Sequence, residues 1–162
     1  LADDGGSGKR SLARPEVTPM DLALEEARAA AARGEVPVGA VVVDANGTVL
    51  AQAGNRTLEL HDPTAHAEVL VLRTAAAALG SERLIECDLY VTLEPCAMCA
   101  GAISFARIRR LYFGASDPKG GAVEHGARFF GQPTCHHAPE IYGGIGESAA
   151  ASLLKGFFAA LR

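Results

Sequence analysis

Four segments of the chain carry apolar residues at the three- to four-residue spacing of a helix. The first opens with Thr18, which can act as an N-cap, has a proline at its first helical position and ends at Gly34. Gly80 provides a similar end for the second. The pattern predicts helices at residues 18–34, 65–80, 96–108 and 147–162.

The segments between these helices are typical of strands. Residues 87–95 alternate in polarity, and residues 36–55 divide at an Asp-Ala-Asn-Gly turn into the two arms of a hairpin. The segment 117–139 is rich in Gly, Pro and His, and we expect it to be irregular. The predicted strands are two within 36–55, one at 87–95, one at 109–116 and a short one near Ile141.

This order of elements predicts a single α/β domain whose sheet is covered by helices on both faces, a three-layer α/β/α arrangement. The opening hairpin makes the sheet of about five strands mixed rather than fully parallel. In such sheets, binding sites gather at the carboxyl ends of strands and at the helix N-termini beside them. We assign residues 15–162 to this domain and residues 1–14 to a disordered tail, which lacks the apolar segment of a signal peptide.

The composition is that of a folded protein, because 49% of the 162 residues are hydrophobic and 21% are charged. No apolar run reaches the roughly 18 residues that a membrane helix needs, so we expect no membrane partner. Four cysteines are too few for a disulfide scaffold of this length. These features predict a cytoplasmic protein with reduced cysteines.

The net charge of −4 is unevenly distributed. Residues 15–106 contain five basic and thirteen acidic residues, whereas residues 107–162 contain seven basic and four acidic residues. A basic C-terminal third permits a contact with RNA but does not require one, since a mixed solvated surface has the same composition.

Two cysteines and a histidine form a candidate metal site. Cys96 and Cys99 are separated by one helical turn at the start of a predicted helix, where the helix N-terminus favours thiolates. Together with His66, at the start of another helix, they make a three-ligand zinc set that leaves the fourth position for water. Taken without His66, the two cysteines are equally well explained as a redox pair or as buried small side chains.

The other two thiols decide whether this site is open or closed. Cys87 begins the strand that leads to Cys96, so roughly 30 Å of extended chain separates the two. Cys135 lies in the irregular segment, and its spacing does not exclude it as a fourth ligand. A fourth protein ligand would indicate a structural zinc site rather than a catalytic one.

Glu68 lies two residues after His66, in the first turn of the same predicted helix. From there its carboxylate can take a proton from a water molecule at the metal and hand it to a substrate nitrogen. The alternative is that Glu68 only complements the helix dipole, which contributes less than about 1 kcal/mol. Because the three candidate ligands are also present, the catalytic interpretation of Glu68 is favoured.

The motifs His-Ala-Glu at 66–68 and Pro-Cys-Ala-Met-Cys at 95–99 resemble the signature of the zinc-dependent nucleobase and nucleoside deaminases. The resemblance covers nearly everything after the tail, and the segments "DPKGGA" and "LLKGFFAALR" are similar to the branch of that family that acts on tRNA. It implies a cytidine-deaminase-like fold and a hydrolase with one Zn²⁺ per subunit, held by His66, Cys96 and Cys99. Glu68 would be the proton shuttle.

The same resemblance implies a substrate and its contacts. The reaction would be hydrolytic deamination of the wobble adenosine to inosine in a tRNA anticodon stem-loop, catalysed by a homodimer. Asn55 would hydrogen-bond the extruded base, and Asp117 and Lys119 would face the RNA, although a turn asparagine and a solvated turn are the plainer explanations of these residues. Phe129 and Phe130 lie in a segment longer than we expect for that branch, and we favour packing over contact with RNA for both.

Three other functions stay open from the sequence. A deaminase of free guanine or cytosine would use the same zinc and glutamate. A non-enzymatic, zinc-stabilised binding module would close the site with a fourth ligand, for which Cys135 is the candidate. A thioredoxin-like redox protein would leave His66 and Glu68 unexplained.

Overall fold

The helices and strands lie where the apolar pattern predicts them. The computed structural model describes residues 16–161, so the predicted tail at 1–14 lies outside the described residues. The helices are α1 (Pro19–Ala32), α2 (Ala67–Leu79), α3 (Ala97–Ala106) and α4 (Glu147–Ala160), with a short 3-10 helix, η1, at Phe129–Gly131. The strands are β1 (Gly39–Val43), β2 (Val49–Gly54), β3 (Asp88–Leu93), β4 (Arg110–Ala115) and β5 (Glu140–Tyr142).

The five strands form one mixed sheet in the order β2-β1-β3-β4-β5. β1 is antiparallel to both β2 and β3, whereas β3, β4 and β5 are mutually parallel neighbours. It follows that β2 and β3 run in the same direction. The carboxyl ends of β2, β3 and β4 therefore meet at one edge of the sheet, where Asn55, Glu94 and Asp117 follow them.

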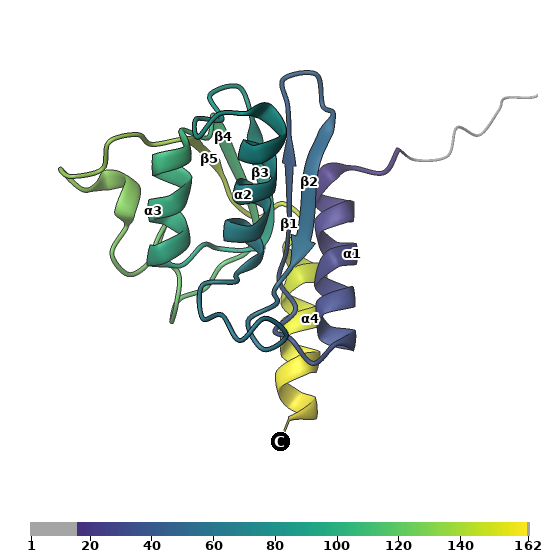
Figure 1. Cartoon of the computed structure of the whole chain (residues 1–162). Helices are drawn as coiled ribbons and strands as arrows, with labels where there is room; N and C mark the ends of the chain where they lie inside the picture. Colours follow the sequence, from purple (N-terminus) through teal and green to yellow (C-terminus); the bar gives the residue numbers. More distant parts are fainter. Residues whose placement is uncertain (1–15, 162) are drawn as a thin grey trace, which may run out of the picture.

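Helices cover both faces of the sheet, as predicted (Figure 1). β1 is buried on both sides because alternate residues face opposite layers. Val41 and Val43 join the cluster formed with α1 and α4, and Val42 joins the larger cluster formed with α2 and α3. The three-layer α/β/α prediction is confirmed.

The first helix shows how local sequence sets this packing. Thr18 and Asp21 form a reciprocal capping box that starts α1, which satisfies amides that the helix itself leaves without partners. α1 then lies so close to β1 that a Cβ on Gly39 would collide with the backbone of Ala23. A glycine at this position therefore sets the distance between the first helix and the sheet. Within residues 16–161, no helix combines the length and hydrophobicity needed to span a bilayer.

Candidate active site

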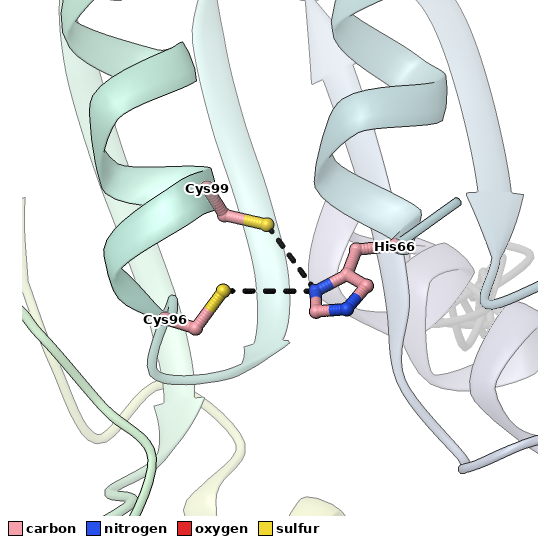
Figure 2. Close-up of side chains that lie close together, drawn as sticks. All are labelled: His66, Cys96 and Cys99. Atoms are coloured by element: carbon pink, nitrogen blue, oxygen red, sulfur yellow. Dashed lines mark hydrogen bonds between the residues drawn. The ribbon is translucent and has the colours of Figure 1, made fainter. Parts of the chain in front are cut away.

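The side chains of His66, Cys96 and Cys99 converge from two helix starts. His66 is the residue just before α2, Cys96 is the residue just before α3, and Cys99 lies in the first turn of α3. His66 Nδ1 is 3.7 Å from the Cys96 sulfur and 3.5 Å from the Cys99 sulfur (Figure 2). All three donor atoms lie within 4.8 Å of one another, so the structure brings together the three residues that the sequence nominated.

This donor set fits zinc in chemistry and in spacing. A tetrahedral zinc ion with ordinary Zn–N and Zn–S bond lengths separates a nitrogen and a sulfur ligand by about 3.5 Å. The observed separations are 3.5 and 3.7 Å. A hydrogen bond from Cys99 lowers the pKa of the Cys96 thiol to about 4, with burial opposing and His66 assisting, whereas the same hydrogen bond and burial raise the pKa of the Cys99 thiol. Cys96 is therefore ready to act as a thiolate, the form that binds metal.

The two remaining thiols lie elsewhere. Cys87 is buried just before β3 begins, whereas the metal-binding group lies beyond the carboxyl end of that strand. The Cys135 sulfur is 3.6 Å from the Ser104 hydroxyl and donates to the His137 carbonyl oxygen at 3.2 Å. Among residues 16–161, the group of possible ligands contains one histidine and two cysteines, which is the open set expected of a catalytic rather than a structural site.

Glu68 lies in the first turn of α2 and lines the same pocket as the three donors. Its side chain is buried, with 4% of the residue surface exposed. Burial raises the pKa of the Glu68 carboxyl above its ordinary value, while hydrogen bonds from its own backbone amide and from Cys99 oppose the rise. A carboxyl group whose pKa is raised holds an accepted proton more firmly than an ordinary carboxyl does, as a proton shuttle requires.

The pocket itself is small, partly open to solvent, and lined by both polar and apolar residues. Its volume is about 260 Å³, below the range of pockets that hold drug-sized ligands, so it suits a single flat ring system. The residues that line it come from several separate parts of the chain: Val36, Val38, Asn55, Thr57, His66, Glu68, Leu93, Glu94, Cys96, Asp117 and Gly120.

Asn55 lines the pocket, but the oxygen of its side-chain amide already accepts a hydrogen bond from the protein. Its Oδ1 accepts a hydrogen bond from the Ala67 amide at 2.8 Å, which provides the first residue of α2 with a partner. The backbone amide of Asn55 donates to the Val38 carbonyl oxygen, and the Arg33 side chain donates to the Asn55 carbonyl oxygen, so the backbone of Asn55 is fixed on both sides. The Nδ2 group is therefore the part of the side chain best placed to meet a ligand.

Asp117 and Lys119 do not take equivalent positions. Asp117 lines the metal pocket, and its Oδ1 accepts from the Lys119 and Gly120 amides in a tight turn. Lys119 is exposed and lines an adjoining groove of about 840 Å³ between this turn and the end of α4. The groove continues from the pocket, because both are lined by Val36, Leu93, Asp117 and Gly120.

Two buried glutamates beside the pocket were not found from the sequence. Glu35, 2% exposed, accepts from the Leu58 and Glu59 amides at 3.0 and 2.9 Å. Glu94, also 2% exposed, accepts hydrogen bonds from the loop that follows β4. The available signal was a charged residue placed against apolar neighbours at the end of an element, as in Leu-Glu-Pro at 93–95. Phe130 packs against the larger core cluster, as we favoured.

Comparison with known proteins agrees with this geometry. The family described as the cytidine and deoxycytidylate deaminase zinc-binding region matches residues 15–115. The tRNA-specific adenosine deaminase of Agrobacterium fabrum is 67% identical over 139 residues, covering 86% of this chain and 91% of that protein. The tRNA-specific adenosine deaminase of Rickettsia bellii is 47% identical over 144 residues, covering 88% and 99%.

The solved structures that this chain resembles are also deaminases. A structure from studies of A-to-I editing by tRNA:A34 deaminases superposes with a TM-score of 0.82 at 67% identity, covering 84% of this chain and 98% of that chain. The guanine deaminase of Nitrosomonas europaea is more distant, with a TM-score of 0.72, 29% identity and coverage of 93% and 87%.

Proposed function

The chain belongs to the cytidine and deoxycytidylate deaminase family, and we propose that it hydrolyses the wobble adenosine of a tRNA anticodon loop to inosine. The observation that carries the substrate is the 67% identity, over 86% of the chain, to a tRNA-specific adenosine deaminase. The grouping of His66, Cys96 and Cys99 around a pocket that also holds Glu68 supports the chemistry. Residues 15–162 form the deaminase domain.

His66 Nδ1 and the sulfurs of Cys96 and Cys99 would hold one zinc ion per subunit. The ion would supply a water molecule whose pKa is lowered to about 7. Glu68 accepts a proton and delivers it to N1 of the adenine ring, and a second proton leaves with the departing amine. Water adds its oxygen at C6 and the C6–N bond breaks, so adenosine and water give inosine and ammonia.

Asn55 orients the base through the part of its amide that the protein leaves free. Because Oδ1 is held by the Ala67 amide, Nδ2 points its hydrogens toward the pocket and donates to a ring nitrogen of adenine. The small pocket holds the extruded base away from water, and an anticodon loop supplies an unstacked base at little cost.

The RNA around the target base lies over the adjoining groove. Asp117 stands at the boundary between pocket and groove, and Lys119 offers a positive charge to a phosphate. We propose a homodimer, which is supported by the exposed apolar side chains of α3, where Phe105 is 70% exposed and Met98 38% exposed. The free cysteines of the described residues support a reducing compartment such as the cytoplasm.

The decisive experiment offers the zinc-loaded protein three substrates in parallel. An anticodon stem-loop with adenosine at the wobble position is read by inosine formation, and free guanine and free cytosine are read by ammonia release. We expect inosine in the stem-loop and no ammonia from either free base. Ammonia from guanine without inosine in the stem-loop would favour the alternative supported by the Nitrosomonas europaea structure.

A further inference from the structure

The carboxylate of Glu94 collects hydrogen bonds from one loop. Its side chain is fully buried. Oε1 accepts from the Asp117 amide at 3.0 Å and from His125 Nδ1 at 2.8 Å. Oε2 accepts from the amides of Val123, Glu124 and His125 at 3.2, 3.1 and 3.2 Å. Five donors therefore converge on one charged group, and four of the five are backbone amides.

The loop that supplies these donors, residues 117–125, contains no helix or strand of its own. It folds tightly over the carboxylate, because a Cβ on Gly121 would collide with Glu94 Oε2. The Ala122 amide donates to the Pro95 carbonyl at 2.8 Å, which adds a second attachment to the same short segment. Glu94 thus satisfies buried and part-buried amides that regular secondary structure satisfies elsewhere.

Both oxygens of the Glu94 carboxylate are already occupied by donors from the loop, although the residue stands only two positions from Cys96. Neither oxygen is left to contact the reacting atoms. The influence of Glu94 on the reaction must therefore pass through the loop.

The loop carries the residues that face the RNA in the proposed function. Asp117 and Gly120 line the metal pocket, and Lys119 lines the groove beside it. Asp117 itself donates to Glu94, and Lys119 and Gly120 follow it by two and three positions, so a shift of the carboxylate moves all three relative to the pocket. A displacement of the order of 1 Å in a positioning contact can cost about 10²-fold in rate.

We propose that Glu94 is a positioning residue for RNA recognition: its buried carboxylate fixes the loop 117–125 so that Asp117 and Lys119 meet the nucleotides beside the target base. The inference rests on the proposed function and deepens it. It separates two neighbouring glutamates by role, because Glu68 moves protons and Glu94 shapes the surface that selects the substrate.

The test is Glu94→Gln in the full zinc-loaded chain. Gln preserves the size of the side chain, but its NH₂ group faces donors where a carboxylate oxygen stood. We expect KM for the wobble-adenosine stem-loop to rise about 10- to 100-fold while kcat changes less than about threefold. Zinc content should remain one per chain, and hydrogen exchange at the amides of residues 117–125 should accelerate.

The matched control is Glu124→Gln. It removes a charge from the same loop, but the Glu124 side chain is exposed and only its backbone amide contacts Glu94. We expect KM and amide exchange to stay within about twofold of the unsubstituted protein. A rise in KM equal to that of Glu94→Gln would assign the effect to loop charge and overturn the proposal.

Gly121→Ala provides a second route to the same displacement if Glu94→Gln does not fold. The added methyl group would collide with Glu94 Oε2 and with the Asp117 carbonyl oxygen, so the loop and the carboxylate must move apart while the charge of Glu94 is kept. We expect the same rise in KM with zinc retained. An unchanged KM, or a fall in kcat at constant KM, overturns the positioning role only. Absence of inosine with the unsubstituted protein refutes the proposed function, and this inference with it.

Discussion

Replacing Asn55 separates two roles of one side chain: its oxygen holds the first amide of α2, and its Nδ2 group is proposed to hold the base. Asn55→Ala removes the acceptor of the Ala67 amide, which lies at the first residue of α2, where the helix offers no partner of its own. Ala67 is fully buried, so its amide has little access to water. An orphaned buried amide costs about 1–3 kcal/mol. In a domain of this size, each 1 kcal/mol lowers the melting temperature by about 2–4 °C, which predicts a fall of about 2–12 °C.

Asn55→Asp restores the acceptor but not the Nδ2 donor. A negative charge at the start of α2 gains about 0.3–1 kcal/mol from the helix dipole, while burial beside the Glu68 carboxyl works against it. We expect the Asp variant to recover at least half of the stability that the Ala variant loses. Both variants lack the donor to the base, so kcat/KM should fall in both by about 5- to 150-fold, the equivalent of about 1–3 kcal/mol.

Thermal unfolding and inosine formation, measured on the same zinc-loaded preparations, check both halves of this reasoning. A melting temperature for the Ala variant equal to that of the unsubstituted protein would show that the Ala67 amide does not depend on Asn55. Full activity in the Asp variant would refute the role of Nδ2 in holding the base.

Three further outcomes follow from the geometry. Glu68→Gln should keep one zinc per chain, measured by metal analysis, while inosine formation falls by about 10²- to 10⁴-fold because the proton shuttle is lost. Cys135→Ser should change neither zinc content nor turnover, since its sulfur contacts Ser104 and the His137 carbonyl; loss of zinc would revive the closed-site alternative. The folded-state pKa of Glu94 lies below the ordinary 4.5, so its stabilising contribution is present above the unfolded pKa and disappears as the pH falls through the folded value. In urea titrations the stability difference between the unsubstituted protein and Glu94→Gln should therefore narrow as the pH is lowered from about 7 to below about 4.

Most of the fold and the metal-binding residues could be predicted because their signals are local. Apolar spacing and capping residues located the elements, and the pair Cys96 and Cys99 is readable within one helical turn. No local pattern links His66 to that turn, since thirty positions separate the two segments. Their association was predicted from the ligands that zinc prefers. The structure shows that this distance closes because β2 and β3 run in the same direction.

The remaining features depend on contacts between segments that no local pattern links. The use of the Asn55 oxygen by α2 is visible only when the end of β2 and the start of that helix are placed together. The hydrogen bonds from residues 117–125 to the Glu94 carboxylate join residues that are 23 to 31 positions apart in the chain. The segment 117–139 looked merely irregular because its order comes from one buried carboxylate and from Phe130, which packs against the core, rather than from periodicity.

The dependence of residues 117–125 on Glu94 has a consequence for protein engineering. Four of the five donors belong to the main chain, which every amino acid except proline can supply. Side chains at Lys119 and Glu124, which point outward, can therefore be randomised in a directed-evolution library while the architecture of the segment persists. Gly121 is the position to leave untouched. Selectivity for new oligonucleotides could thus be tuned there without disturbing the metal or the proton shuttle.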